Sequence, residues 1–206
     1  MLKINKYGNY KANTIKFFDK VAEKNHGDSY KHYEKALEWI EPLNVKSILD
    51  LGTGRGDFIE SLKKKYPQRQ YDIYGIDISE NMISKAKSKG IDAKFSVGES
   101  ENIKFENNYF DLVVCINSFH HYEKPEISIK EIHRVLQDGG VLILGEIYLP
   151  KILAKFINKL LPYGTTGDYK IYSLEELKKM FQKENLYLEK QNYVFPSIKT
   201  YMFRKH

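Results

Sequence analysis

Residues 47–57 read SILDLGTGRGD, and the organisation of the chain can be worked out from this stretch. Its first five residues form an apolar run typical of a buried β-strand, and glycine then occupies positions 52, 54 and 56. Glycines at alternate positions let the backbone turn sharply and come close to a ligand, and a following helix offers unpaired N–H groups. The stretch therefore predicts a strand, a ligand-binding loop and the start of a helix.

Short apolar runs alternate with helical patterns onward to residue 144. Ser79 is a suitable N-cap and Gly90 a suitable end for one of these helices. Strands separated by helices form parallel neighbours, so we expect the α/β class, with a doubly wound, mostly parallel, seven-stranded Rossmann-like sheet and helices on both faces. The expected strands are 71–76, 93–97, 111–116 and 141–144, and the expected helices are 58–66, 79–89 and 125–136.

Two segments outside this core have a different character. Residues 10–42 are rich in aromatic side chains and are predicted to form one or two helices, an N-terminal helical cap over the sheet edge. Residues 151–161 place apolar side chains on one helical face and Lys151, Lys155 and Lys159 on the other. We expect this second segment to be a lid insertion after the fifth strand. The alternative is a surface that meets acidic lipid or RNA.

The C-terminal part completes the sheet. Ser173 and Glu176 form a capping box that starts the last helix, and strands are expected at 186–190 and 198–204. At 206 residues the chain has the length of one domain. We divide this single domain into the cap at 1–45, a ligand-binding core at 46–147, and the lid, last helix and final two strands at 148–206.

The glycine loop disfavours two common nucleotide sites. The dinucleotide fingerprint G-x-G-x-x-G would need glycine at position 57, where this chain has Asp57, and an anionic side chain there argues against NAD. No G-x-x-x-x-G-K-[ST] loop is present, so ATP and GTP hydrolysis are disfavoured as well. An ordinary tight turn is the remaining alternative for the three glycines.

The spacing D-x-G-x-G-x-G resembles motif I of the class I S-adenosylmethionine-dependent methyltransferases. Asp77, at the end of the second strand, matches the acidic residue with which that family holds both ribose hydroxyls. Residues 110–121, FDLVVCINSFHH, resemble motif IV of the methyltransferase type 11 group, which includes quinone-biosynthesis methyltransferases. The resemblance covers residues 46–147 and implies S-adenosylmethionine as cofactor and S-adenosylhomocysteine as product. The cofactor-binding residues that it implies are Asp50, Gly52, Thr53, Gly54, Arg55, Gly56, Asp77, Ile78, Met82, Gly98, Glu99, Ser100 and Asn117.

Few side chains near the strand ends are suited to proton transfer. His120, His121 and Tyr148 are the catalytic candidates, with Glu146 as a further base, and all are needed only if the acceptor arrives protonated. Packing of the two histidines on the loop is an equal alternative. No metal site is expected, because no carboxylate or further histidine lies at ligand spacing in the sequence. Cys115 lies in an apolar strand and is interpreted as a core residue.

The charge pattern bears on the methyl acceptor. The chain has 33 Lys and Arg against 27 Asp and Glu, a net charge of +6, yet only four of the basic residues are arginine. Arginine is the side chain best suited to phosphates, so a solvated lysine surface is favoured and nucleic acid is disfavoured as a partner. The amino-methyltransferase signature [DN]-P-P-[YF] is absent after the fourth strand. We expect a small organic acceptor, and the alternatives are an RNA or protein methyltransferase or a non-catalytic S-adenosylmethionine-binding protein.

Location and assembly are weakly specified by the sequence. No apolar run approaches the ~20 residues of a membrane span, and the N-terminus lacks the apolar stretch of a signal peptide. A cytoplasmic protein is therefore expected, and peripheral membrane contact through residues 151–161 is left open. One cysteine excludes an internal disulfide. Monomer and homodimer are both compatible with the sequence.

Overall fold

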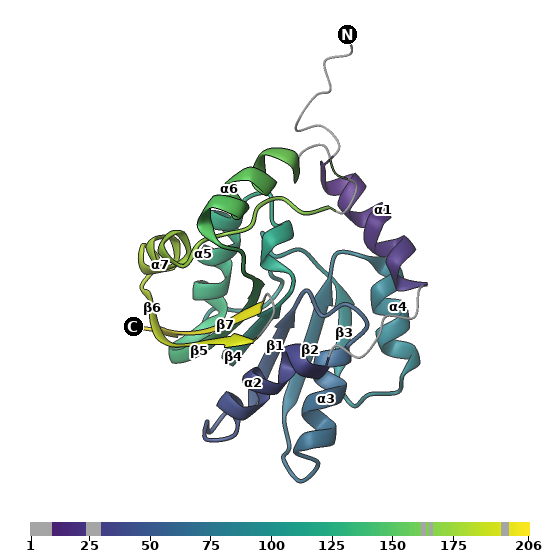
Figure 1. Cartoon of the computed structure of the whole chain (residues 1–206). Coiled ribbons are helices and arrows are strands. Elements are labelled where there is room, and N and C mark those ends of the chain that lie inside the picture. Colours follow the sequence, from purple (N-terminus) through teal and green to yellow (C-terminus); the bar gives the residue numbers. More distant parts are fainter. Residues whose placement is uncertain (1–9, 24–29, 162–163, 165–166, 195–197) are drawn as a thin grey trace.

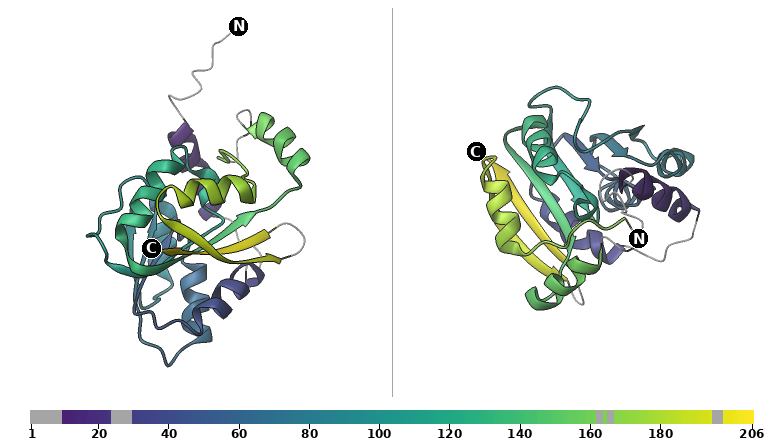
Figure 2. Two further views of the ribbon diagram at one scale, coloured as in Figure 1. Left: turned by 90° about the vertical axis from the view of Figure 1, so that its left-hand side faces the viewer. Right: turned by 90° about the horizontal axis from the view of Figure 1, so that it is seen from above.

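The computed structural model describes residues 10–23, 30–161, 164, 167–194 and 198–206. One seven-stranded sheet carries helices on both of its faces (Figures 1 and 2). The helices are α1 (Tyr10–Ala22), α2 (Tyr30–Ile40), α3 (Asp57–Lys65), α4 (Glu80–Ser88), the 3₁₀ turn η1 (Phe119–His121), α5 (Pro125–Val135), α6 (Lys151–Leu160) and α7 (Leu174–Gln182). The strands are β1 (Ser47–Leu51), β2 (Asp72–Asp77), β3 (Lys94–Val97), β4 (Phe110–Ile116), β5 (Leu136–Ile147), β6 (Leu186–Val194) and β7 (Ile198–Lys205).

The strand order in the sheet is β3-β2-β1-β4-β5-β7-β6. The strands from β1 to β5 pair in parallel, whereas β7 is antiparallel to both β5 and β6. The expected seven strands are confirmed, and the sheet is mixed because β7 runs in the opposite direction. The chain passes from β1 to β2 on one side and returns to β4 on the other. The carboxyl ends of β1 and β4 therefore flank a topological switch point, the position where such sheets bind ligands.

Two hydrophobic clusters cover the two faces of the sheet. Neighbouring residues of β1 point to opposite faces, so that Leu49 belongs to one cluster and Ile48 to the other. The Leu49 cluster includes residues of α5 and α7, such as Ile132 and Phe181. The Ile48 cluster includes residues of α2, α3 and α4, such as Leu37. A parallel sheet covered on both faces explains why the strands of the core are almost continuously apolar.

The N-terminal helices differ from the expected cap over the sheet edge. The edges of the sheet are β3 and β6. Helix α2 instead packs on a face of the sheet, because Ala36, Leu37 and Ile40 are fully buried in the cluster with Ile48. Helix α1 packs against α4. The aromatic segment that suggested a cap is thus divided between two places. Helix α2 lies on the sheet face, and α1 lies against α4.

Strand β5 begins at Leu136, earlier than the strand expected at 141–144. Phe110 pairs with Leu136, but the next pair is Leu112 with Val141, so residues 137–140 interrupt the regular ladder. Gly139 has a φ of 75° in this irregular stretch. Gly139 and Gly140, which follow the helix expected at 125–136, therefore lie within a bulged strand. Helix α5 correspondingly ends at Val135.

Arg134 fixes the segment between β3 and β4. Its guanidinium donates to the carbonyl oxygens of Ile103 at 2.8 Å and Phe105 at 2.7 Å. It also donates to both carboxylate oxygens of Glu131 at 2.8 Å, and Glu131 accepts from the Ile103 N–H at 2.8 Å. The guanidinium makes these four hydrogen bonds at once, whereas an ammonium group has only three donors.

We expect Arg134→Lys to lower the free energy of unfolding by about 1–2 kcal/mol, because carbonyl acceptors lose their donors. Lys130→Ala, which truncates an exposed side chain of the same helix, is the matched control and is expected to stay within about 0.5 kcal/mol of the wild type. Urea denaturation of the three proteins measures both effects. Equal stability of Arg134→Lys and the control would show that the segment is held by its apolar contacts alone.

Candidate functional site

The loop after β1 is bound to the end of β2 by backbone hydrogen bonds. The N–H groups of Gly52 and Thr53 both donate to the carbonyl of Ile76 at 2.9 Å. Gly52 has a φ of +78°, and a Cβ added to it would lie 1.9 Å from the Ser118 Oγ. Glycine is needed here because the backbone takes a left-handed turn while the end of β4 approaches it closely.

Asp77 receives two backbone donors at the same point. Its Oδ2 accepts from the Gly54 N–H at 2.9 Å, and its Oδ1 accepts from the Ser79 N–H at 2.9 Å. Burial raises the pKa of this carboxyl group, and the backbone donors oppose that shift. Each carboxylate oxygen can accept more than one hydrogen bond. Asp77 therefore holds the loop in place and keeps acceptor capacity for a ligand with neighbouring hydroxyl groups.

Two of the residues predicted to bind the cofactor, Asp50 and Gly56, pack behind the loop that follows β1. Asp50 is buried and accepts from the Thr53 Oγ1 at 2.6 Å, and burial raises its pKa to about 7. A Cβ on Gly56 would lie 3.1 Å from the Phe95 ring, so this position sits against the core. Neither Asp50 nor Gly56 lines the cavity described next. Both shape the loop and do not face a ligand.

The loop opens into a cavity of about 340 Å³ at the carboxyl ends of the strands. Gly54 lines this cavity, and no atom lies within 4 Å of the position that its Cβ would take. The α1 residues Phe17 and Phe18 form part of its wall. Of the residues expected to bind cofactor or act in catalysis, the lining contains Gly52, Thr53, Gly54, Arg55, Asp77, Ile78, Met82, Gly98, Glu99, Ser100, Asn117 and His121.

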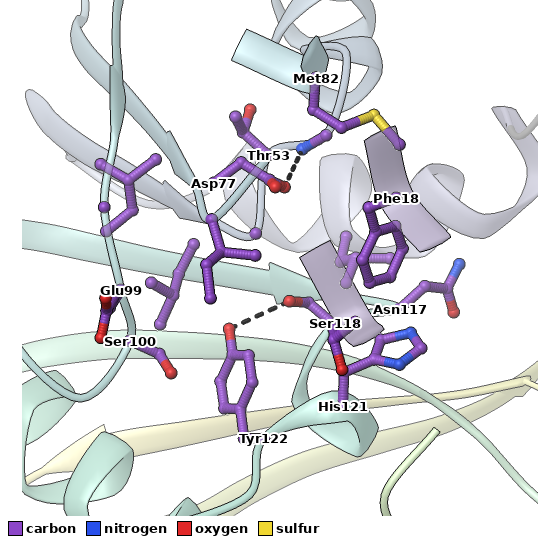
Figure 3. A pocket seen from close by; sticks show the side chains of 18 of the residues that line it. Phe18, Thr53, Asp77, Met82, Glu99, Ser100, Asn117, Ser118, His121 and Tyr122 are labelled. Carbon is purple, nitrogen blue, oxygen red and sulfur yellow. Dashed lines mark hydrogen bonds between the residues drawn. The ribbon is translucent and has the colours of Figure 1, made fainter. Parts of the chain in front are cut away.

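The two ends of the cavity differ in chemistry (Figure 3). Glu99 and Ser100 lie at one end, where Glu99 forms an ion pair with Lys11 and the Ser100 Oγ lies 2.8 Å from the Ser128 Oγ. Phe18 and His121 lie at the other end, with their rings 4.8 Å apart and nearly perpendicular. A polar end and an aromatic end allow one cavity to hold a polar cofactor next to an apolar acceptor.

Several lining residues were not singled out from the sequence. The Ser118 Oγ donates to the Tyr122 hydroxyl at 3.1 Å, and burial holds the pKa of Tyr122 well above its usual range. Tyr122 directly follows the NSFHH run, so extending that motif by one residue would have predicted Tyr122 as a site residue. Thr14 and Phe18 come from α1, which belongs to the segment expected to form an N-terminal cap. Only the packing of α1 against α4 shows that these two residues reach the cavity.

His120 is buried and lies behind the cavity wall. Its Nδ1 lies 2.8 Å from Glu146 Oε2, and its Nε2 lies 3.5 Å from Asp168 Oδ1. Burial alone would lower the pKa of His120, but the two carboxylates more than offset this and hold it above its ordinary value. His120 is therefore held between two carboxyl groups that favour its protonated form, and it does not line the cavity.

His121 has the opposite character. Its Nδ1 lies 2.8 Å from the Gly167 carbonyl oxygen, which can only accept, so the ring proton resides on Nδ1 and the lone pair on Nε2. Burial and the neighbouring charge of His120 lower its pKa to about 4. His121 is thus a neutral hydrogen-bond acceptor at neutral pH, and it lines the cavity.

Two sequence-based expectations need correction here. Tyr148 does not line the cavity; its ring packs against Tyr193, and the Lys199 Nζ lies 3.7 Å from its centroid. The premise that no carboxylate accompanies the histidines is also wrong. The fold brings Asp168 to them, and these three side chains offer atoms within 4.8 Å of one another, a spacing that could hold a metal ion. The contacts of His120 with Glu146 and Asp168 account for the same arrangement without a metal ion.

The lid expected after the fifth strand is not formed by its helix. Among the described residues, no residue of α6 lines the cavity. The following segment does reach the site, because the N–H groups of Tyr169 and Lys170 donate to the His120 carbonyl at 2.8 and 3.0 Å. The outer wall of the cavity is formed by α1.

The fold and the glycine loop together define an α/β protein with a cavity at its switch point that suits a nucleoside-containing ligand. A family model described as "Methyltransferase domain" matches residues 49–144. A demethylmenaquinone methyltransferase of Thermotoga maritima is 30% identical over 161 residues, which cover 74% of this chain and 69% of that protein. One of Bacteroides fragilis is 31% identical over 123 residues, covering 56% of this chain and 49% of that protein. The chain thus spans about half the length of this second relative.

Solved structures agree on the fold. A chain in the complex between the Haloferax volcanii Trm112 methyltransferase activator and a methyltransferase matches with a TM-score of 0.77 at 19% identity, covering 94% of this chain and 98% of that one. From the sequence relatives and the matched motifs, this chain belongs to the class I S-adenosylmethionine-dependent methyltransferases. Its cofactor is accordingly S-adenosylmethionine.

The site residues fit this cofactor. The cavity lies within the roughly 300–1,000 Å³ range of small-ligand sites. The Asp77 carboxylate is already oriented by backbone donors and can accept from both ribose hydroxyls. The space above Gly54 is open, so a ligand can contact the backbone there.

Gly54→Val is expected to weaken S-adenosylmethionine binding at least about tenfold, because the side chain would occupy this open space. Gly90→Val is the matched control. Gly90 also has a positive φ and no atom near its Cβ position, but it lies at the end of α4 and outside the cavity lining. Both variants should lose about 1–2 kcal/mol of stability from the left-handed backbone, and only Gly54→Val should lose affinity in calorimetric titration. Equal affinities would show that the loop is only a turn.

Proposed function

We propose that this chain transfers a methyl group from S-adenosylmethionine to a small organic acceptor with an aromatic ring. The single observation that carries the proposal is the cavity in which the Asp77–Gly54 pair lies next to a wall of aromatic side chains. In this arrangement Asp77 would hold the ribose, Ile78 and Met82 would pack on the adenine, and the segment from Gly98 to Ser100 would meet its polar edge.

When bound, S-adenosylmethionine supplies an electrophilic methyl group on a sulfonium. The residues of the chain contribute by holding the acceptor in line with that group and by excluding water, since alignment alone can lower a barrier by up to about 7–11 kcal/mol. Phe18 and Tyr122 supply apolar walls for this purpose. No covalent intermediate with a protein side chain is needed.

His121 is proposed to position the acceptor. A neutral imidazole with its lone pair on Nε2 can accept a hydrogen bond from a hydroxyl group of the acceptor. With a pKa of about 4 it is a weak base at neutral pH, which favours orientation over full proton removal. His120 acts through its neighbour: the two rings lie 4.0 Å apart, and the charge on His120 helps to keep His121 neutral.

Two observations support the class of methyl acceptor: the charged side chains that line the cavity and the names of the similar proteins. Five carboxyl groups and two basic side chains line the cavity, an excess of acidic groups that disfavours a phosphate backbone as the partner. The curated relatives are named as demethylmenaquinone methyltransferases, which supports a quinone-type ring as the acceptor. The rings of Phe17, Phe18, Tyr33 and Tyr122 in the lining suit such a ring.

Transfer of label from radioactive S-adenosylmethionine tests this proposal. The purified chain is incubated with chemically reduced demethylmenaquinone of short side chain, and in parallel with total RNA and with protein of its host. We expect label in the solvent-extractable quinone fraction and background in the two macromolecular fractions. Gly90→Val should retain transfer and Gly54→Val should lose it.

Three outcomes would contradict the proposal. Label confined to RNA or protein would assign the chain to macromolecular methylation. Label in a small molecule that has no aromatic ring, added from a host metabolite extract, would refute the acceptor class. Intact cofactor binding with no label in any fraction, the extract included, would identify a non-catalytic binding protein.

A further inference from the structure

Helix α6 carries the most exposed apolar surface among the described residues. The exposed fractions of its large apolar side chains are 88% for Ile152, 62% for Phe156, 53% for Leu160 and 45% for Leu153. Scattered single apolar residues on a surface are ordinary, but four on one ten-residue helix form a contiguous patch. Such a patch indicates a surface that is covered when the protein functions.

The side chains of α6 are arranged in parallel rows. Residues four apart lie on one side of a helix, so Ile152, Phe156 and Leu160 form an apolar row. Lys151, Lys155 and Lys159 precede these residues by one position each and form a basic row beside it. All three lysines are exposed. The outer surface of α6 is therefore apolar along one line and positively charged along the next.

The remaining side of α6 attaches it to the protein. Ala154 is buried, and Asn158 forms two hydrogen bonds with the backbone of Ile171, at 2.9 Å to the carbonyl and 2.8 Å from the N–H. These contacts fix the rotation of the helix, so that the apolar and basic rows face outward together. Figure 2 shows α6 projecting from the body of the molecule.

We propose that α6 is a docking surface for a lipid bilayer with anionic headgroups. The basic row requires a negatively charged partner next to an apolar layer, and an anionic bilayer supplies both in that order. The segment offers no countercharge of its own, because the sequence has no Asp or Glu between Glu146 and Asp168. A second copy of α6 would place lysines against lysines.

The position of α6 connects this docking surface to the cavity. The role of that connection in supplying the methyl acceptor rests on the proposed function. The chain leaves α6 and returns through Gly167 and Tyr169, which bond to His121 and His120 respectively. A bilayer at α6 is thus one short segment away from the aromatic end of the site. An apolar ring compound dissolved in the bilayer could then enter the cavity without crossing water. The helices in the described part of the chain include none with the length and apolar character of a membrane span.

Vesicle flotation of the full chain tests the docking surface without any methyl transfer. The probes are vesicles of phosphatidylcholine alone and vesicles with about a third of phosphatidylglycerol. We expect binding to the anionic vesicles that weakens as salt rises. Ile152→Gln with Phe156→Gln should lower binding at least about tenfold. Lys151, Lys155 and Lys159 changed together to Gln should remove the preference for anionic lipid.

Matched controls separate α6 from general effects of charge and apolar surface. Val97→Gln with Ile127→Gln removes two exposed apolar side chains elsewhere, and Lys178, Lys179 and Lys183 changed to Gln remove three exposed charges from α7 and its end. Both controls should bind vesicles as the wild type does. Binding lost equally in the controls, or absent from the wild type, would overturn the proposal.

Cofactor binding and methyl transfer, measured on the α6 variants, distinguish a failure of this inference from a failure of the proposed function. The α6 variants should bind S-adenosylmethionine normally and methylate a detergent-dispersed acceptor at the wild-type rate, losing rate only with acceptor in vesicles. A wild type that methylates dispersed acceptor but never binds vesicles would refute the docking surface alone. A wild-type dimer that Phe156→Gln converts to monomer, with no vesicle binding, would reassign α6 to contact between copies.

Discussion

The bond between the Asp77 carboxylate and the Gly54 N–H is the constraint on which the site depends. It joins the loop after β1 to the end of β2, while Ser79 binds the other carboxylate oxygen at the start of α4. The loop after β1, the end of β2 and the start of α4 thus meet at one partly buried carboxyl group. Burial disfavours the ionised form of this group and the backbone donors favour it, and its oxygens remain able to accept from a ligand.

The rest of the site is assembled around this point from distant parts of the chain. The order β2-β1-β4 places the ends of three strands side by side, so that Ser118 reaches the loop at Gly52. Helix α1 closes the outer side, and the segment at Gly167 holds His121. The pKa values of the two histidines shift in opposite directions. The carboxyl groups of Glu146 and Asp168 raise the pKa of His120, whereas burial and the neighbouring His120 lower that of His121, which leaves His121 neutral in the cavity wall.

The sequence predicted those features of the fold that depend on neighbouring residues, such as the ends of helices. The Ser79 N-cap and the Ser173–Glu176 capping box are both present, because each is decided within one helical turn. The strands of the core were predicted within a few residues, except that β5 begins at Leu136 through a bulge that only its pairing with β4 reveals. Asp168 could not be associated with the histidines, since tertiary structure alone brings it there. For the same reason Tyr148 was placed wrongly, because the strand end turns its ring toward Tyr193.

The central claim is that Asp77 is the residue on which the cofactor depends, and calorimetric titration of S-adenosylmethionine tests it most directly. The titration compares the wild type with Asp77→Ala and with Asp72→Ala, which removes an exposed carboxylate paired with Lys94 at the start of the same strand. The account predicts a loss of about 1.5–3 kcal/mol of binding free energy for Asp77→Ala, the scale of hydrogen bonds to a charged group, and no change for Asp72→Ala. Equal affinity of the folded Asp77→Ala variant and the wild type would contradict it.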